Sequence, residues 1–261
     1  MIITKGTIMT ISKIGAGLLS LAALTIGACS TAGQSLSAAD IQAAIDAPER
    51  SAEHIARDAN RLPAEIIAFS GVSVGDTVVD IAPASGYYTA LLSRIVGPEG
   101  NIIGIGPQRI FDVFPNAPEG FQKYIARDPR ENVTYSTANL DAVDLPDNVD
   151  QIWMILYYHD TYWTGEDRAE MNRRFYEALR PGGVYFIIEH NGQAVPDQDI
   201  TQTLHRLETA PAVAEIEAAG FKLAATSDLL RNPEDPLTVS VFDPEWRGKT
   251  DRVVWKFVKP E

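Results

Sequence analysis

Cysteine and basic residues are both scarce in this chain. Its 261 residues include a single cysteine, Cys29, so no disulfide can form within the chain and the folded part must be stable through its core alone. Lys and Arg number 22 against 35 Asp and Glu, which gives a formal net charge of −13 at pH 7. An acidic chain repels phosphate backbones, and no basic stripe interleaved with aromatic residues is present. We therefore expect no nucleic-acid partner.

A long apolar run is missing near the start of the chain. The run from Ile14 to Ala28 is too short to span a bilayer comfortably. It follows Lys5 and Lys13 and ends in small residues just before Cys29, a pattern typical of an export signal.

The residues around the cysteine, Ile26-Gly27-Ala28-Cys29, resemble a bacterial lipobox. The resemblance implies that Cys29 is acylated and becomes the mature N-terminus. We expect residues 1–28 to be a lipoprotein signal peptide, residues 29–37 a tether and residues 38–261 one folded domain. The protein would then lie in the bacterial cell envelope, facing the periplasm, with the lipid anchor as its only membrane contact. The alternative is a plain cleaved signal peptide with an incidental cysteine.

Helical and β-rich stretches alternate from Ser37 onward without an internal repeat. Strands are predicted at residues 77–81, 101–105, 133–136, 151–156, 184–189, 221–227 and 252–258, and helices at residues 38–59, 63–69, 88–96, 168–179 and 211–219. Strands separated by helices imply a mostly parallel sheet that is covered on both faces. The sequence therefore predicts a single Rossmann-like, doubly wound α/β domain with a seven-stranded sheet.

The segment Val78 to Thr89 is an apolar strand that ends in Asp80, followed by a turn of small residues that opens a helix. Such a turn lets the backbone approach a ligand, and the helix presents unpaired N–H groups to it. This order resembles motif I of class I S-adenosylmethionine-dependent methyltransferases. That family usually reads acidic-x-Gly-x-Gly-x-Gly, whereas here Ala82 and Ala84 occupy the first two glycine positions and Gly86 the third.

A second element, Leu179-Arg180-Pro181-Gly182-Gly183 before a strand, resembles the same family. The resemblance implies the class I methyltransferase fold with an antiparallel last strand, and S-adenosylmethionine as cofactor. The residues that it assigns to the cofactor are Asp80, Ala82, Ala84, Ser85, Gly86 and Asp141. The second strand offers no acid for the ribose hydroxyls at its end, where Gln108 stands instead.

Three of the four histidines follow predicted strands four and five. In the methyltransferase fold this rim binds the acceptor, and a His beside a carboxylate can act as a general base. We take His159, Asp160 and His190 as catalytic candidates. The candidates for binding a small-molecule substrate are Tyr158, Trp163, His205 and Arg206. Two alternatives stay open: a transition-metal site formed by His159, His190 and His205 with a nearby carboxylate, and three unrelated loop or capping histidines.

The C-terminal part carries alternating charges at residues 230–235 and 247–252, which favour an ion-paired lid over the rim. With the exported start and the histidine segments, this pattern resembles a family of bacterial proteins described as predicted methyltransferases. The function hypothesis is methyl transfer to an unidentified small molecule. The alternatives are a methyltransferase fold with a lost cofactor site that performs metal-dependent chemistry, and a non-catalytic binding protein.

Overall fold

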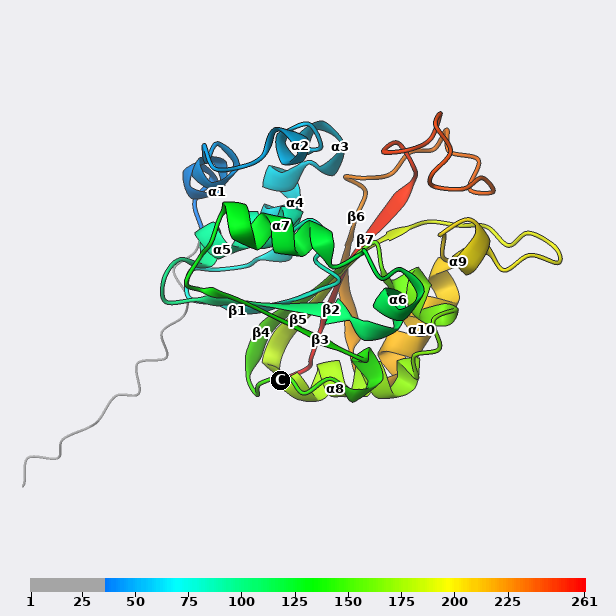
Figure 1. The fold of residues 1–261 in the computed structure, drawn as a ribbon. Coiled ribbons are helices and arrows are strands. Elements are labelled where there is room, and N and C mark those ends of the chain that lie inside the picture. Colours follow the sequence, from blue (N-terminus) through cyan, green and yellow to red (C-terminus); the bar gives the residue numbers. More distant parts are fainter. Residues whose placement is uncertain (1–35) are drawn as a thin grey trace, which may run out of the picture. The chain divides into compact units, whose positions relative to one another are not determined.

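The structure, a computed structural model, describes residues 36–261 (Figure 1). The predicted signal peptide, Cys29 and all but the end of the predicted tether lie outside these residues. Within them, seven strands form one sheet in the order β3-β2-β1-β4-β5-β7-β6. The strands are β1 Thr77–Ile81, β2 Asn101–Pro107, β3 Val133–Ala138, β4 Val149–Ile155, β5 Leu179–His190, β6 Lys222–Ser227 and β7 Arg252–Val258.

Strands β1 to β5 pair in parallel, and β7 runs antiparallel to both β5 and β6. The predicted fold class, a mostly parallel seven-stranded sheet with an antiparallel last strand, is confirmed. In the residues that the structure describes, the helices are α1 Ala38–Ile45, α2 Ala52–Ile55, α3 Asp58–Arg61, α4 Pro63–Ser70, α5 Tyr87–Val96, α6 Gln108–Val113, α7 Glu119–Arg127, α8 Arg168–Ala178, α9 Ile200–Thr203 and α10 Thr209–Ala218, with 3₁₀ turns η1 Leu140–Ala142 and η2 Tyr158–Tyr162.

The single helix predicted over residues 38–59 is wrong, because the chain there forms three short helices. Helix α1 ends before Asp46, and Pro48 cannot continue it, since proline lacks the N–H that a helix interior needs. The buried guanidinium of Arg50 then ties the segments together by donating to the carbonyl of Ile45 at 2.7 Å and pairing with Asp58. This break turns α2 and α3 toward the carboxyl ends of the strands.

The sheet separates two apolar layers, because successive side chains of a strand point to opposite faces. On one face Val78, Trp153 and Phe186 pack with residues of α1, α4 and α5. On the other face, Val79 and Ile187 pack in the cluster that includes residues of α8 and α10. Figure 1 shows α5 and α7 on one side of the sheet and α8 and α10 on the other.

The order of strands reverses between β1 and β4, so their connections leave toward opposite sides of the sheet. A crevice opens at such a switch point outside the carboxyl ends of the strands, and it is where open α/β sheets bind ligands. No helix within residues 36–261 is long and apolar enough to cross a membrane.

Candidate active site

A cavity of about 880 Å³ lies at the switch point. This volume is near the upper end of the range for small-molecule sites, which runs from about 300 to about 1,000 Å³. Its walls come from α2 and α3, the turn after β1, the segment from β2 to α7, the ends of β4 and β5, and the loops around residues 205 and 241–252. Its lining residues include Arg57, Arg61, Ala82, Pro83, Ala84, Ile110, Phe111, Phe114, Phe121, Tyr135, Leu156, Tyr157, His159, Asp160, His190, His205, Phe242, Arg247, Thr250 and Arg252.

The turn after β1 keeps a glycine-type backbone although two of its residues are alanine. Ala82 has φ 55° and Ala84 has φ 51°, both in the left-handed region, and Gly86 has φ 75°. The amide of Ala82 donates to the carbonyl of Ile105 at 2.9 Å, and that of Gly86 to Pro83 at 2.8 Å. A Cβ at Gly86 would lie 2.6 Å from Cγ of Tyr124 on α7, so only glycine fits there. The turn therefore has the backbone that the motif requires, at the cost of strain at two alanines.

Residues with such strained backbone gather around the cavity. Eight non-glycine residues between 36 and 261 have positive φ, and four of them line it: Ala82, Ala84, Leu156 and His205. Left-handed backbone in residues other than glycine costs free energy and is concentrated at functional sites. Leu156 turns the chain from β4 into η2, and His205 turns it from α9 toward α10.

Four of the six predicted cofactor residues do not line the cavity: Asp80, Ser85, Gly86 and Asp141. The carboxylate of Asp80 is buried and accepts a hydrogen bond of 2.6 Å from Thr89, so it supports the turn from within the sheet. Burial raises the pKa of Asp80 to about 7. Ser85 presents its carbonyl to Nε2 of His54 at 3.0 Å, which ties α2 to the turn. Gly86 caps α5.

Asp141 was predicted to contact the cofactor from the loop after β3. In the structure it lies in η1, where it accepts from Arg109 at 2.7 Å and from the amide of Asp167 at 2.9 Å. Asp141 is not part of the cavity wall, because these two bonds hold its carboxylate toward α8. Gln108 starts α6 and donates to Asp112 at 2.8 Å.

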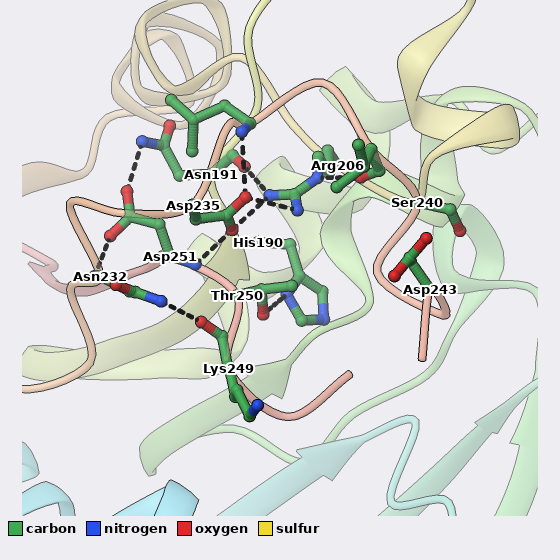
Figure 2. Close-up of polar contacts among 12 residues, drawn as sticks. His190, Asn191, Arg206, Asn232, Asp235, Ser240, Asp243, Lys249, Thr250 and Asp251 are labelled. Atoms are coloured by element: carbon green, nitrogen blue, oxygen red, sulfur yellow. Dashed lines mark hydrogen bonds and ion pairs between the residues drawn. The ribbon is translucent and has the colours of Figure 1, made fainter. Parts of the chain in front are cut away.

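The prediction that Arg206 binds substrate is wrong. Its guanidinium is fully buried and forms two bonds with Asp235, at 2.9 and 3.0 Å. It also donates to the carbonyls of Asn191 at 2.8 Å and Val239 at 2.6 Å (Figure 2). Arg206 therefore fastens the segment after β6 to the end of β5. Of the ion pairs expected within the C-terminal charges, that of Arg231 with Asp251 is present.

Tyr158 and Trp163 also differ from the prediction, since neither lines the cavity. The side chain of Tyr158 is fully buried on the α8 side, where its hydroxyl accepts from Asn172 at 2.8 Å. Trp163 donates from Nε1 to Asp160 at 3.0 Å, and its ring centroid lies 6.3 Å from that of His205. Both residues position the rim.

The cationic groups of the cavity are four arginines, none of them among the predicted site residues: Arg57, Arg61, Arg247 and Arg252. None of them forms an ion pair with an acid in residues 36–261. The guanidinium of Arg61 lies 4.6 Å from the ring centroid of Tyr87, beside the turn after β1. Burial lowers the pKa of Arg57 and Arg252. In an acidic protein, unpaired arginines in a cavity favour an anionic ligand.

One wall of the cavity is apolar: Ile110, Phe111, Phe114 and Phe121 come from the segment between β2 and β3, and Tyr135 comes from β3 itself. The ring of Tyr135 stacks on Phe121 with centroids 4.4 Å apart. A Cβ at Gly106 would lie 2.7 Å from Cζ of Phe111, so glycine is needed for this close packing.

The histidine rim predicted from the sequence is present, and His159 is its centre. Nδ1 of His159 lies 2.9 Å from Oε1 of Glu189, a fully buried carboxylate that also accepts from the amides of His159 and His190. On the other side of the ring, Nε2 is 3.2 Å from Nδ1 of His205 and 3.3 Å from Oδ1 of Asp160.

The rim contains two kinds of imidazole. Burial alone would lower the pKa of His159, but the charge of Glu189 and the bonds to Asp160 and Glu189 outweigh it and raise the pKa to about 10. The pKa of Asp160 falls to about 2, because its bonds to the two histidines outweigh burial. Burial and the neighbouring cations hold the pKa of His190 well below its usual value. His190 is therefore neutral near pH 7, and its Nδ1 lies 2.8 Å from Oγ1 of Thr250 (Figure 2).

Comparison with known proteins gives consistent matches. Residues 40–135 match the family model of protein-L-isoaspartate(D-aspartate) O-methyltransferase. The chain is 26% identical over 178 residues to the ubiquinone/menaquinone biosynthesis C-methyltransferase UbiE of Pasteurella multocida, an alignment that covers 67% of this chain and 63% of that protein. The chain thus spans less than two thirds of that relative's length.

Two solved structures share the fold. A SAM dependent methyltransferase from Aquifex aeolicus has a TM-score of 0.58 at 17% identity and covers 86% of this chain and 99% of that chain. An S-adenosylmethionine dependent methyltransferase from Mesorhizobium loti has a TM-score of 0.54 at 16% identity and covers 76% and 97%. With the strand order, these matches show that the chain has the class I S-adenosylmethionine-dependent methyltransferase fold.

Proposed function

We propose that this chain is an S-adenosylmethionine-dependent methyltransferase that modifies a small anionic molecule. One observation carries the proposal: the turn after β1, the unpaired arginines and the histidine rim all line a single cavity at the switch point. The family model and the methyltransferase relatives support the activity. The acceptor is inferred from the cavity alone, because the names of relatives describe their own substrates.

The cavity fits the cofactor in two respects. Its apolar wall around Ile110 and Phe111 suits an adenine ring, and the strained turn at Ala82 and Ala84 exposes backbone where the superfamily holds the methionine part. Arg61 stands beside that turn and suits the carboxylate of the cofactor. When bound, S-adenosylmethionine supplies an electrophilic methyl group.

On the acceptor side, Arg247 and Arg252 would bind an anionic group, and the neutral ring of His190 would take a proton from the acceptor. If Nδ1 of His190 donates to Thr250, Nε2 keeps the lone pair that a base needs. The cavity then contributes proximity and orientation, which matter most for a direct displacement.

Calorimetric titration tests the proposal. S-adenosylmethionine and S-adenosylhomocysteine are titrated into the full chain, its Arg61→Gln and Ile110→Glu variants, and Arg127→Gln as the matched control, an exposed arginine outside the cavity. We expect both ligands to bind the wild type, the first two variants to lose affinity at least about tenfold, and the control to keep it. Absence of binding to the wild type would overturn the proposal.

We also propose that the protein is an envelope lipoprotein anchored through Cys29, which rests on the lipobox-like residues 26–29. Expression of the wild type and of Cys29→Ser in a bacterial host, followed by membrane fractionation and mass spectrometry of the N-terminus, tests it. An acylated cysteine in the membrane fraction is expected for the wild type only. An intact N-terminus on the wild type would refute the anchor.

A further inference from the structure

We infer that His159, Asp160 and His205 form a site for a divalent transition-metal ion on the wall of the cavity. The three ligand atoms are Nε2 of His159, Oδ1 of Asp160 and Nδ1 of His205. The inference differs from the trio of histidines that the sequence suggested, because Asp160 takes the place of His190. Only the role of the metal toward an acceptor rests on the proposed function.

The distances among the three atoms match a coordination shell. They are 3.2 Å between the two nitrogens and 3.3 Å from each nitrogen to the carboxylate oxygen. A zinc ion that binds ligands at about 2.0–2.1 Å with tetrahedral angles sets those ligands about 3.3 Å apart. The triangle is therefore the size of one face of such a shell, without any movement of the side chains.

The contacts of His159 direct its Nε2 toward the centre of this triangle. Glu189 accepts hydrogen bonds from two backbone amides, and the contact of its Oε1 with Nδ1 of His159 assigns a proton to that nitrogen. Binding of a metal ion releases the proton from Nε2, whose lone pair then points at the ion. Nε2 faces the carboxylate of Asp160, which is also an acceptor, so a cation between them is stabilised.

Two of the three proposed ligands form a further hydrogen bond that fixes their orientation, as metal ligands in proteins do. Glu189 orients His159 through Nδ1, which is the carboxylate–histidine–metal arrangement. Nε1 of Trp163 donates to Oδ1 of Asp160 at 3.0 Å and fixes that carboxylate. The ring of His205 packs against Phe242 with centroids 4.8 Å apart, and its backbone is held at φ 52°. A strained backbone that aims a side chain at a cluster is the kind of strain found at functional sites.

The donor set and the surroundings point to the kind of metal and its role. Two imidazoles and one carboxylate suit Zn²⁺, Fe²⁺, Co²⁺ or Mn²⁺, and three protein ligands leave a position open for another ligand. All three residues line the cavity, so a ligand in the open position can come from there. An anionic oxygen of the acceptor, a carboxylate or an ionised hydroxyl, is the chemistry that fits.

Zinc binding to the full chain tests the inference. Chelator-treated protein is titrated with zinc in a calorimeter, and cobalt is added in parallel so that its visible absorption reports the coordination. We expect one zinc per chain for the wild type and a loss of at least about tenfold in affinity for Asp160→Asn and for His205→Ala. Thermal unfolding of each variant without metal shows that it is folded.

His190→Gln is the matched control, since this imidazole is in the same cavity but its ring centroid lies 6.3 Å from that of His159 and its Nδ1 is bound to Thr250. It should bind zinc as the wild type does. The inference is overturned if the wild type takes up no zinc or cobalt, or if folded Asp160→Asn and His205→Ala bind as tightly as the control.

Titration of S-adenosylmethionine with and without zinc separates this inference from the proposed function. Cofactor binding without zinc binding overturns the metal site and leaves the methyltransferase proposal standing. Zinc binding without cofactor binding supports the metal site and overturns the methyltransferase proposal.

Discussion

Arg206 and Asp235 form a fully buried, bidentate ion pair with distances of 2.9 and 3.0 Å between its nitrogen and oxygen atoms. The pair joins the chain after β5 to the segment after β6, which supplies Arg247 and Arg252 to the cavity. Asp235 also accepts from the amide of Asp251 at 2.6 Å, so one carboxylate fixes both ends of that segment.

Asp235→Ala should destabilise the protein by about 3–5 kcal/mol, because it leaves the buried guanidinium of Arg206 without a counter-charge. Urea unfolding measures the change. The matched control is Arg231→Ala, which breaks the pair with Asp251 but removes a side chain that is 45% exposed. It should cost less than about 1 kcal/mol. If both variants lost the same free energy of unfolding, the buried pair would stabilise the protein no more than the exposed one does.

Gly86→Ala should cost more free energy of unfolding than Gly75→Ala, and it should also weaken S-adenosylmethionine binding. Both glycines have positive φ, so both variants carry backbone strain of about 1–2 kcal/mol. Only at Gly86 would the new Cβ meet a ring, that of Tyr124, whereas at Gly75 nothing lies within 4 Å. Urea unfolding gives the stabilities, and calorimetry the affinity. If Gly86→Ala lowered the free energy of unfolding no more than Gly75→Ala does, α7 would be able to shift Tyr124 away from the new Cβ at little cost.

The strands were predictable because short apolar runs bounded by turn residues are a local signal, and the alternation with helices implied a parallel sheet. The proximity of His159 and His190 followed from the same argument, since β4 and β5 are neighbours in the sheet. The predictions that failed concern side chains that pair with residues far away in the sequence. Nothing near Arg206 indicates that Asp235, 29 residues later, neutralises it.

The arginines of the cavity were missed for a related reason. Arg57 was predicted to lie within one long helix and Arg61 just after it, and only the break after α1 turns them toward the strand ends. Likewise, the alanines of motif I looked like a departure from the glycine pattern. A sequence cannot show that Ala82 and Ala84 adopt the glycine backbone anyway, because the surrounding packing imposes that conformation.

Asp80→Asn should change how stability depends on pH. Burial raises the pKa of Asp80 to about 7 from its ordinary value of 3.8, so the folded protein binds a proton that the unfolded chain has released. The contribution of Asp80 to stability therefore falls as the pH rises from about 4 to about 7, by about 1.4 kcal/mol per unit at most, and is constant above that. The asparagine carries no charge and can still accept from Thr89.

Urea unfolding of the wild type and Asp80→Asn at pH 4.5, 6 and 8 (about these values) measures the difference. From about pH 4.5 to about pH 8, the free energy of unfolding of the variant should rise relative to that of the wild type. Parallel curves would mean that Asp80 is solvated in the folded protein, contrary to its burial.

Ala84→Gly should stabilise the protein, an unusual effect for a glycine substitution. Ala84 has φ 51°, a conformation that costs alanine about 1–2 kcal/mol and glycine almost nothing. Glycine loses more backbone freedom on folding, by about 0.5–1 kcal/mol, so the net gain should be about 0–1.5 kcal/mol. Ala64→Gly within α4 is the control, where glycine should instead cost about 1 kcal/mol. Opposite signs in urea unfolding would establish that the turn is strained at Ala84, whereas a loss for both would mean that the alanine fits its conformation without cost.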